Sequence, residues 1–191
     1  MTVHPFVLAI GDSLTAGYGL AAHEAFPARL QARLRARWPQ ATVQNAGVSG
    51  DTTADALRRL PRLLAGLKAR PDLAIVEIGA NDLLRGIGPA AARANLDAIV
   101  TELQRCGIPV LLATLDLPPL LAALAGGHAT IYADVATRHG IPATPFFPAG
   151  VLGHPALVLA DRLHPNARAI EMAAEAVEPA AVRMLEHVAA A

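Results

Sequence analysis

Hydrophobic positions along the chain follow two alternating patterns. Short apolar runs end at Gly, Asn or Pro, whereas longer stretches rich in Ala, Leu and Arg repeat their apolar residues every three or four positions. The first pattern is typical of buried strands and the second of amphipathic helices. The predicted strands span residues 6–11, 41–46, 73–79, 108–115 and, with a weaker pattern, 141–145. The predicted helices span residues 23–38, 52–69, 89–106 and 129–139, followed by a last helical region from Pro165 onward.

This alternation of strands and helices indicates an α/β fold with a parallel sheet. The strands are almost continuously apolar, so helices should cover both faces of the sheet. Pro179 should kink or divide the last helix, because proline lacks an N–H and clashes with the preceding turn. A length of 191 residues suits one compact unit, and we find no linker or repeat, so we expect a single domain over residues 1–191.

Three segments expected to follow strands are unusually apolar for connections. They are residues 83–87, 115–125 and 145–160. Loops normally run over the surface and are polar, so apolar ones either pack against the body of the protein or line a pocket. Both interpretations stay open at this point. If they line a pocket, the candidate substrate-binding residues are Leu83, Leu84, Ile87, Leu117 and Pro118.

Composition and charge argue against several classes of protein. Sixteen basic and sixteen acidic side chains give a formal net charge of zero, which argues against nucleic-acid binding, because that requires clustered Lys and Arg. The single cysteine, Cys106, excludes an internal disulfide and a multi-cysteine metal site. No run reaches the ~20 apolar residues of a membrane span, and we find no signal peptide at the N-terminus. We therefore expect a cytoplasmic location, or a periplasmic or secreted one if a leader has been removed.

Serine is rare in this chain and occurs where a hydroxyl can react. The two serines, Ser13 and Ser49, both lie in glycine-containing turns that follow predicted strands. A hydroxyl at the carboxyl end of a strand is exposed and can serve as a nucleophile. Ser is also a preferred helix N-cap, and the sequence Gly11-Asp12-Ser13-Leu14 taken alone favours that structural role.

A serine nucleophile needs a base, and one of the seven histidines is placed for that role. His164 follows Asp161 by three residues, and Pro165 after it predicts the first turn of a helix with His164 at the cap. The Asp161 carboxylate can accept the Nδ1–H of His164, leaving Nε2 free to take a proton. The competing pair, Asp134 and His139, lies within one predicted helix and its end, which more often indicates a solvated face.

Two further turns offer hydrogen-bond donors for the negative oxygen of a tetrahedral intermediate. The Gly50 N–H follows the second strand and the Asn81 side-chain amide follows the third. Taken singly, each is a common turn sequence. In a sheet of order 2-1-3-4-5, however, the carboxyl ends of the strands form one ligand-binding edge, so Ser13, Gly50, Asn81, Asp161 and His164 should converge there.

Four sequence blocks, GDSLTAGYG, NAGVSGDTT, GANDLLRG and DRLHPNA, resemble the conserved blocks of the SGNH or GDSL hydrolases in order and spacing. The chain is most similar to the small bacterial type described as thioesterase, arylesterase and lysophospholipase. The resemblance implies a flavodoxin-like three-layer α/β/α fold. It also implies Ser13 as nucleophile, an Asp161–His164 pair completing the triad, and an oxyanion hole formed by Gly50, Asn81 and the Ser13 N–H.

The sequence thus predicts a two-step hydrolysis of carboxylic esters through an acyl-enzyme, with no metal and no cofactor. The apolar connections predict a small-molecule substrate whose acyl group has some aliphatic length. Thioesters and lysophospholipids share the same tetrahedral chemistry. Two alternatives stay open: a carbohydrate acetylesterase of the same fold, and a non-catalytic protein that binds a lipid or an anion. The sequence does not indicate an oligomeric state.

Overall fold

The computed structural model, which describes residues 4–115 and 125–190, contains a five-stranded parallel sheet in the order β2-β1-β3-β4-β5. This order confirms the prediction. β1 pairs with both β2 and β3, and Gly11 at its end lies between Gly47 and Glu77 of its neighbours. The strands are β1 (Phe6–Gly11), β2 (Thr42–Gly47), β3 (Leu73–Glu77), β4 (Val110–Thr114) and β5 (Ala143–Pro145).

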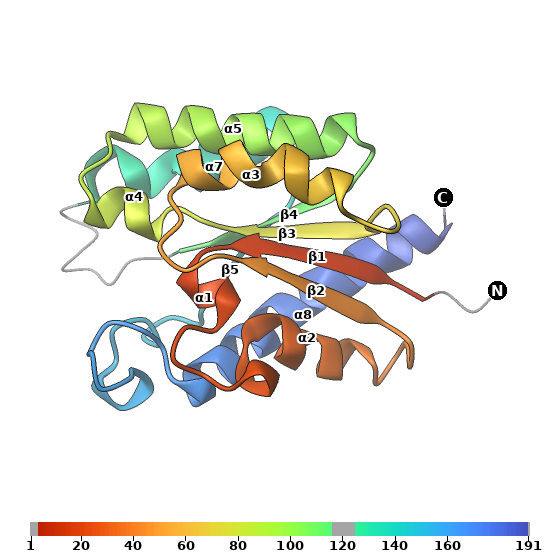
Figure 1. Cartoon of the computed structure of the whole chain (residues 1–191), viewed down its shortest axis with the longest axis horizontal. Coiled ribbons are helices and arrows are strands. Elements are labelled where there is room, and N and C mark those ends of the chain that lie inside the picture. The colour runs from red at the N-terminus through yellow and green to blue at the C-terminus, as the bar shows by residue number, and fades with distance from the viewer. Residues whose placement is uncertain (1–3, 116–124, 191) are drawn as a thin grey trace.

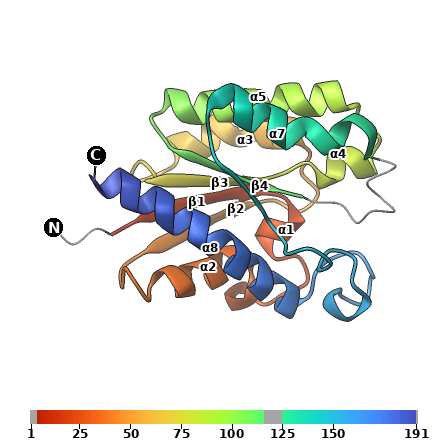
Figure 2. The ribbon, with the colours of Figure 1, turned by 180° about the vertical axis from the view of Figure 1, so that it is seen from behind.

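Helices cover both faces of the sheet, as predicted for a three-layer fold (Figure 1). Helices α3, α5 and α7 lie on one face, and α2 and α8 lie on the other, which Figure 2 shows from behind. The helices are α1 (Ser13–Ala16), α2 (Phe26–Leu34), α3 (Thr53–Ala65), α4 (Ala80–Leu84), α5 (Pro89–Arg105), α7 (Ile131–His139) and α8 (Ala167–Ala190). Single 3₁₀ turns occur at η1 (Ala22–Glu24), η2 (Gly126–Thr130) and η3 (Pro155–Leu157). Within the described ranges, no helix combines the length and apolarity that a membrane span requires.

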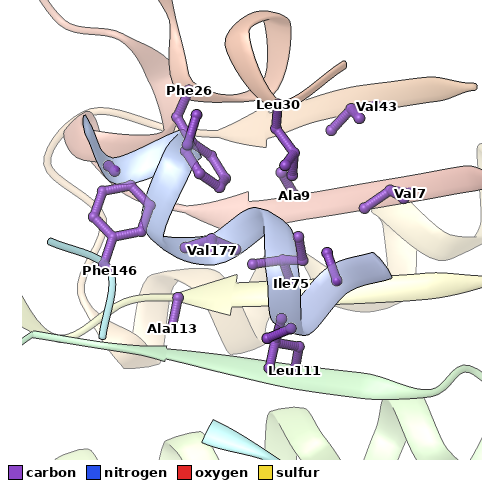
Figure 3. Close-up of a cluster of buried hydrophobic side chains, with 14 of the residues drawn as sticks. Val7, Ala9, Phe26, Leu30, Val43, Ile75, Leu111, Ala113, Phe146 and Val177 are labelled. Atoms are coloured by element: carbon purple, nitrogen blue, oxygen red, sulfur yellow. The ribbon is translucent and has the colours of Figure 1, made fainter. Parts of the chain in front are cut away.

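Alternate residues of each strand face opposite hydrophobic cores, because side chains in a strand alternate between the two faces of a sheet. On β1, Val7 and Ala9 join the core beneath α2 and α8, whereas Leu8 and Ile10 join the core beneath α3, α5 and α7. Figure 3 shows the first of these cores, where side chains of α2 and α8 meet those of the strands. The continuous apolar runs of the sequence are therefore explained by burial on both sides.

Within the apolar segment after β5, the stretch from Phe146 to Val151 places three apolar side chains in the body of the protein. Phe146 is fully buried, and Phe147 and Val151 are 6% and 4% exposed. The Phe146 ring lies 4.7 Å from that of Phe26 on α2 (Figure 3). Of the two interpretations of the apolar connections, packing is therefore correct for this stretch.

The last helix differs from its prediction at two points. It begins at Ala167, and Asn166 caps it by accepting a hydrogen bond from the Ala169 N–H at 3.1 Å, so His164 is not the cap. It also continues through Pro179, so division at this proline is wrong, and a kink stays a prediction. Pro179 lies on the exposed side of α8, where water can satisfy the carbonyl group that loses its helical partner.

Candidate active site

All five predicted site residues lie in segments that follow the carboxyl ends of strands. Ser13 is the first residue of α1, directly after β1. Gly50 lies between β2 and α3, and Asn81 is in α4, after β3. Asp161 and His164 lie between η3 and α8. These segments gather at the left edge of the sheet in Figure 1, where the arrowheads of β1 and β2 end.

The turn that carries Ser13 leaves its hydroxyl group uncommitted. The cap of α1 is Asp12, whose Oδ1 accepts a hydrogen bond from the Leu14 N–H at 3.0 Å. The interpretation of Ser13 as an N-cap is therefore wrong. Neither Oγ nor the N–H of Ser13 has a hydrogen-bond partner among the described residues. A Cβ on Gly11 would lie 2.1 Å from Thr15 Oγ1, so only glycine fits where the turn leaves the strand.

The Asp161–His164 loop holds its imidazole in one orientation. His164 Nδ1 lies 2.7 Å from Asp161 Oδ2, and the backbone N–H groups of Leu163 and His164 donate to Asp161 Oδ1 at 3.0 Å each. These N–H groups and the imidazole lower the pKa of Asp161 to about 2, so it is a carboxylate at neutral pH. The loop closes on itself where the Leu159 N–H donates to the His164 carbonyl at 2.7 Å.

The His164 ring lies against the segment that carries Ser13. Its centroid is 4.2 Å from that of Tyr18, and the Tyr18 N–H donates to the Ser13 carbonyl oxygen at 3.1 Å. A positive charge on His164 would lower the pKa of Asp12, the neighbour of Ser13, because the two side chains are close enough to interact. The base candidate and the nucleophile candidate thus come from distant parts of the chain to one small region. Tyr18 was not predicted, although it lies within the GDSLTAGYG block.

The two predicted oxyanion donors outside the Ser13 turn differ in their present hydrogen bonds. Gly50 has a φ of 87°, and its N–H has no partner in the described part of the chain. Its carbonyl accepts from Arg85 Nη2 at 2.7 Å. The Asn81 amide nitrogen donates to Asp12 Oδ2 at 3.2 Å and to the Asp51 carbonyl at 3.0 Å. Both Asn81 N–H bonds are therefore already used, and one must be exchanged before Asn81 can donate to an oxyanion.

Two buried carboxyl groups lie behind the nucleophile turn. Burial raises the pKa of Asp12 from 3.8 to about 6, although the Leu14 N–H and His164 oppose this rise. Burial and repulsion from Asp12 raise the pKa of Glu77 well above its ordinary value of 4.5, and Glu77 Oε2 accepts from Thr15 Oγ1 at 2.9 Å. Glu77 was not predicted from the sequence. A single acidic residue in the apolar run LAIVEIG was the available signal.

Arginine side chains support the glycine-containing loop from two sides. Arg59 forms an ion pair with Asp51 and donates to the Gly11 carbonyl at 3.1 Å, joining α3 to the end of β1. Arg85 reaches Gly50 from α4. Neither arginine was predicted, because only the fold places them beside this loop. The competing pair does not form: Asp134 binds Arg93, and His139 lies 2.9 Å from Asp97.

The predicted substrate-binding residues have three different outcomes. Leu83 lines a cavity of about 40 Å³ beside β3, which has room for about three water-sized groups. Leu84 is 63% exposed, and Ile87 is half-buried outside the set of residues that line the cavity. Leu117 and Pro118 lie outside the described residues. The cavity is lined by Thr53, Ile78, Gly79, Ala80, Leu83, Ala92, Leu96, Leu115, His128, Ile131 and Tyr132.

A search of residues 4–115 and 125–190 finds no group of three or more His, Cys, Asp or Glu side chains arranged to hold a metal ion. The described part of the site therefore offers hydroxyl, imidazole, carboxylate and amide groups as its reactive chemistry. An unpaired hydroxyl, an imidazole oriented by a carboxylate and free backbone N–H groups are the components of acyl transfer.

The chain is similar to known esterases both in sequence and in structure. The profile of the GDSL-like Lipase/Acylhydrolase family matches residues 9–170. The arylesterase of Vibrio mimicus is 34% identical over 180 residues, covering 94% of this chain and 89% of that protein. The Escherichia coli protein named thioesterase 1/protease 1/lysophospholipase L1 is 34% identical, covering 84% and 75%. The crystal structure of AlinE4, a SGNH-hydrolase family esterase, matches with a TM-score of 0.78 at 44% identity, covering 96% and 97%.

Proposed function

The chain belongs to the GDSL-like lipase/acylhydrolase family and is a carboxylic ester hydrolase, and we propose that Ser13, His164 and Asp161 carry out its reaction. The observation that carries this proposal is the 2.7 Å contact between His164 and Asp161, in a loop that places the imidazole against the turn of the unpaired Ser13 hydroxyl.

The proposed reaction has two steps. His164 Nε2 takes the Ser13 proton while Oγ attacks the substrate carbonyl carbon, and the protonated imidazole then gives its proton to the leaving alcohol. The acyl group remains on Ser13. In the second step His164 activates a water molecule, which releases the acid and restores the serine. Asp161 stabilises the imidazolium in both steps, which its depressed pKa supports because it stays ionised throughout the neutral range.

We propose that the oxyanion is held by the backbone N–H groups of Ser13 and Gly50 and by the Asn81 amide. The absence of partners for both backbone donors among the described residues supports this role. The Asn81 hydrogen bond to Asp12 is the longer of its two, so it is the one we expect to be exchanged when the oxyanion forms.

The substrate we propose is a small ester with an apolar acyl group. Relatives named arylesterase and thioesterase 1/protease 1/lysophospholipase L1 support a range of leaving groups, including phenols, thiols and the glycerol hydroxyl of a lysophospholipid. The apolar lining of the cavity supports an aliphatic acyl chain. Its volume of about 40 Å³ favours the other candidate, a carbohydrate acetylesterase, because an acetyl group fits without rearrangement.

A fluorophosphonate probe tests the nucleophile directly, because the chain has only two serines. We expect the natural protein and the Ser49→Ala variant to be labelled, and the Ser13→Ala variant not to be. Turnover of a p-nitrophenyl ester should fall by about 10⁴-fold or more in Ser13→Ala, with little change in melting temperature. Labelling of Ser13→Ala would contradict the assignment of the nucleophile.

A panel of p-nitrophenyl esters from acetate to decanoate, with acetylated sugars and an acyl-CoA, tests the acyl preference. Values of kcat/KM should rise beyond acetate if the cavity extends during the reaction. A steady fall from acetate onward, with faster hydrolysis of acetylated sugars, would identify the acetylesterase instead. A cytoplasmic location stays a prediction, which fractionation of the source cells would test.

A further inference from the structure

Four large hydrophobic side chains are markedly exposed within the described residues, and each belongs to a different segment of the active-site edge. They follow β1, β2, β3 and β5 respectively. We call them the apolar rim: Tyr18 (50% exposed), Val48 (44%), Leu84 (63%) and Leu163 (53%). Exposed apolar residues scattered singly over a surface need no explanation, whereas their restriction to one functional edge indicates an interaction site.

Contacts connect the apolar rim to the catalytic groups on both sides. Tyr18 stacks on His164, the neighbour of Leu163. On the other side, Arg85, the neighbour of Leu84, binds the Gly50 carbonyl in the loop that carries Val48. The rim is therefore continuous with the loops that hold the proposed base and the proposed oxyanion donor.

Two cations lie within this apolar surface. Arg85 directly follows Leu84, and Arg162 directly precedes Leu163. Both are exposed, and neither forms an ion pair with any residue that the structure describes. Of the nearby acids, Asp51 forms an ion pair with Arg59, and Asp161 is an exposed carboxylate whose hydrogen-bond partner is the His164 imidazole. The edge thus combines exposed apolar side chains with two arginines that form no ion pair among the described residues, although the chain as a whole has no net charge.

We propose that the apolar rim, together with Arg85 and Arg162, docks the enzyme on a lipid surface that carries anionic headgroups. Proteins that bind at a membrane interface combine apolar residues, which enter the acyl boundary, with Arg or Lys residues, which pair with anionic lipid. A second copy of this chain fits the surface less well, because a two-fold contact would bring the unpaired arginines together. The inference rests on the proposed function, because docking at this edge brings the ester group of a lipid in that surface to Ser13.

Vesicle binding tests the proposal. All proteins in this experiment carry Ser13→Ala, so that none of them hydrolyses the lipid. Binding to vesicles is measured by co-sedimentation at low salt. We expect binding to vesicles of phosphatidylcholine with phosphatidylglycerol, weak binding to phosphatidylcholine alone, and a decline as salt rises. Arg85→Gln with Arg162→Gln should weaken binding by about fivefold for each arginine. Leu84→Ser with Leu163→Ser should weaken it by about tenfold or more.

A matched control removes the same charge from the opposite edge of the sheet. Lys68 and Arg183 are exposed there, near the amino ends of the strands, so Lys68→Gln with Arg183→Gln should leave binding nearly unchanged. Absence of binding to the anionic vesicles would overturn the proposal, as would equal losses in the control and rim variants. It would also be overturned if sedimentation velocity showed self-association that Leu84→Ser with Leu163→Ser abolishes.

Two measurements on the natural protein without vesicles distinguish the docking proposal from the proposed function. They are ester turnover and fluorophosphonate labelling. Loss of vesicle binding in a protein that is labelled and active would overturn docking alone. Failure of labelling and turnover would overturn the proposed function.

Discussion

Glu77 places a fully buried carboxyl group at the end of the central strand β3, beside the nucleophile turn. One carboxyl oxygen binds Thr15, and the other has no partner among the described residues. Water is excluded and Asp12 is close, so the neutral form is favoured and the pKa rises. Burial thus makes Glu77 harder to ionise in the folded protein than in the unfolded chain.

Replacing Glu77 with Gln should make the protein relatively more stable as pH rises. The folded protein binds the Glu77 proton more tightly than the unfolded chain does. The stability that this tighter proton binding contributes is therefore complete below pH 4.5, the ordinary pKa of glutamate. It is lost as the pH rises through the raised pKa of the folded protein, and the free energy of unfolding falls by up to about 1.4 kcal/mol per pH unit. Glutamine keeps the shape and cannot ionise. Urea unfolding at pH 5 and pH 9 should show a growing advantage for Glu77→Gln, and parallel profiles would contradict the raised pKa.

Arg162 adopts a φ of 59°, the left-handed conformation that residues other than glycine seldom adopt. It lies between Asp161 and His164, where this turn lets the carboxylate reach the imidazole. We expect Arg162→Gly to be neutral or stabilising by up to about 1 kcal/mol, and Arg162→Val to destabilise by about 1–2 kcal/mol. Chemical denaturation measures both. Arg183→Gly in α8 is the control, and should cost about 1 kcal/mol because its backbone is helical.

At the scale of elements, α4 depends on side-chain contacts for its position. It has five residues, too few for a stable helix alone, and it carries Asn81. Its buried Asp82 accepts hydrogen bonds from the N–H and Oγ1 of Thr53 at 2.8 and 2.6 Å, at the first turn of α3. Asn95 on α5 donates to the same Thr53 hydroxyl at 3.1 Å. These bonds join three helices behind the proposed oxyanion hole.

Removing this contact should impair both stability and catalysis. Asp82→Ala leaves the buried Thr53 N–H without a partner, so we expect a loss of about 3 kcal/mol in the free energy of unfolding. Turnover should fall as well, because Asn81 loses its fixed position. Asn95→Ala removes one neutral hydrogen bond at the margin of the cluster and should cost about 1 kcal/mol. Similar losses in both variants would show that Asp82 does not hold α4 in place.

At the scale of the whole molecule, the segment after β5 links the core to the Asp161–His164 loop. Phe146 is enclosed by Phe26, Phe147 and the α8 side of the sheet (Figure 3). Packing here fixes where the chain leaves the sheet on its way to His164. The position of the proposed base thus depends on a core that also receives α2, from the first quarter of the sequence.

Phe146→Ala should therefore destabilise the protein by about 3–5 kcal/mol and lower kcat, since the cavity loosens the segment that leads to the loop. Phe146→Leu, which fills most of the volume, should cost about 1.5 kcal/mol or less. Thermal unfolding and steady-state turnover at a temperature where both variants are folded provide the measurements. Full activity of folded Phe146→Ala would show that the loop is positioned independently of this core.

The pattern of the sequence predicted the two-sided burial of the sheet and the turns that carry Ser13, Gly50, Asn81, Asp161 and His164, whereas the flavodoxin-like fold with its strand order came from the family resemblance. These features are local or follow from general rules: apolar runs must be buried, and parallel strands end at one edge. The cap of α8 was wrong because Pro165 was taken as the first helical residue, whereas the helix begins two residues later and Asn166, a preferred cap residue, precedes it. Only the β-bridge between Val158 and Pro165, which keeps His164 in the loop, decides between the two starts.

Tertiary structure alone decided which side chains support the site. The Arg59 and Arg85 contacts, the raised pKa of Glu77 and the gathering of the apolar rim involve residues from separate elements, so no local pattern reveals them. The sequence by itself determined the layered architecture and the candidate chemistry, because periodicity and turn residues act locally. The electrostatics and the exposed surface of the active-site edge depend on distances between segments remote along the chain, which exist only after folding.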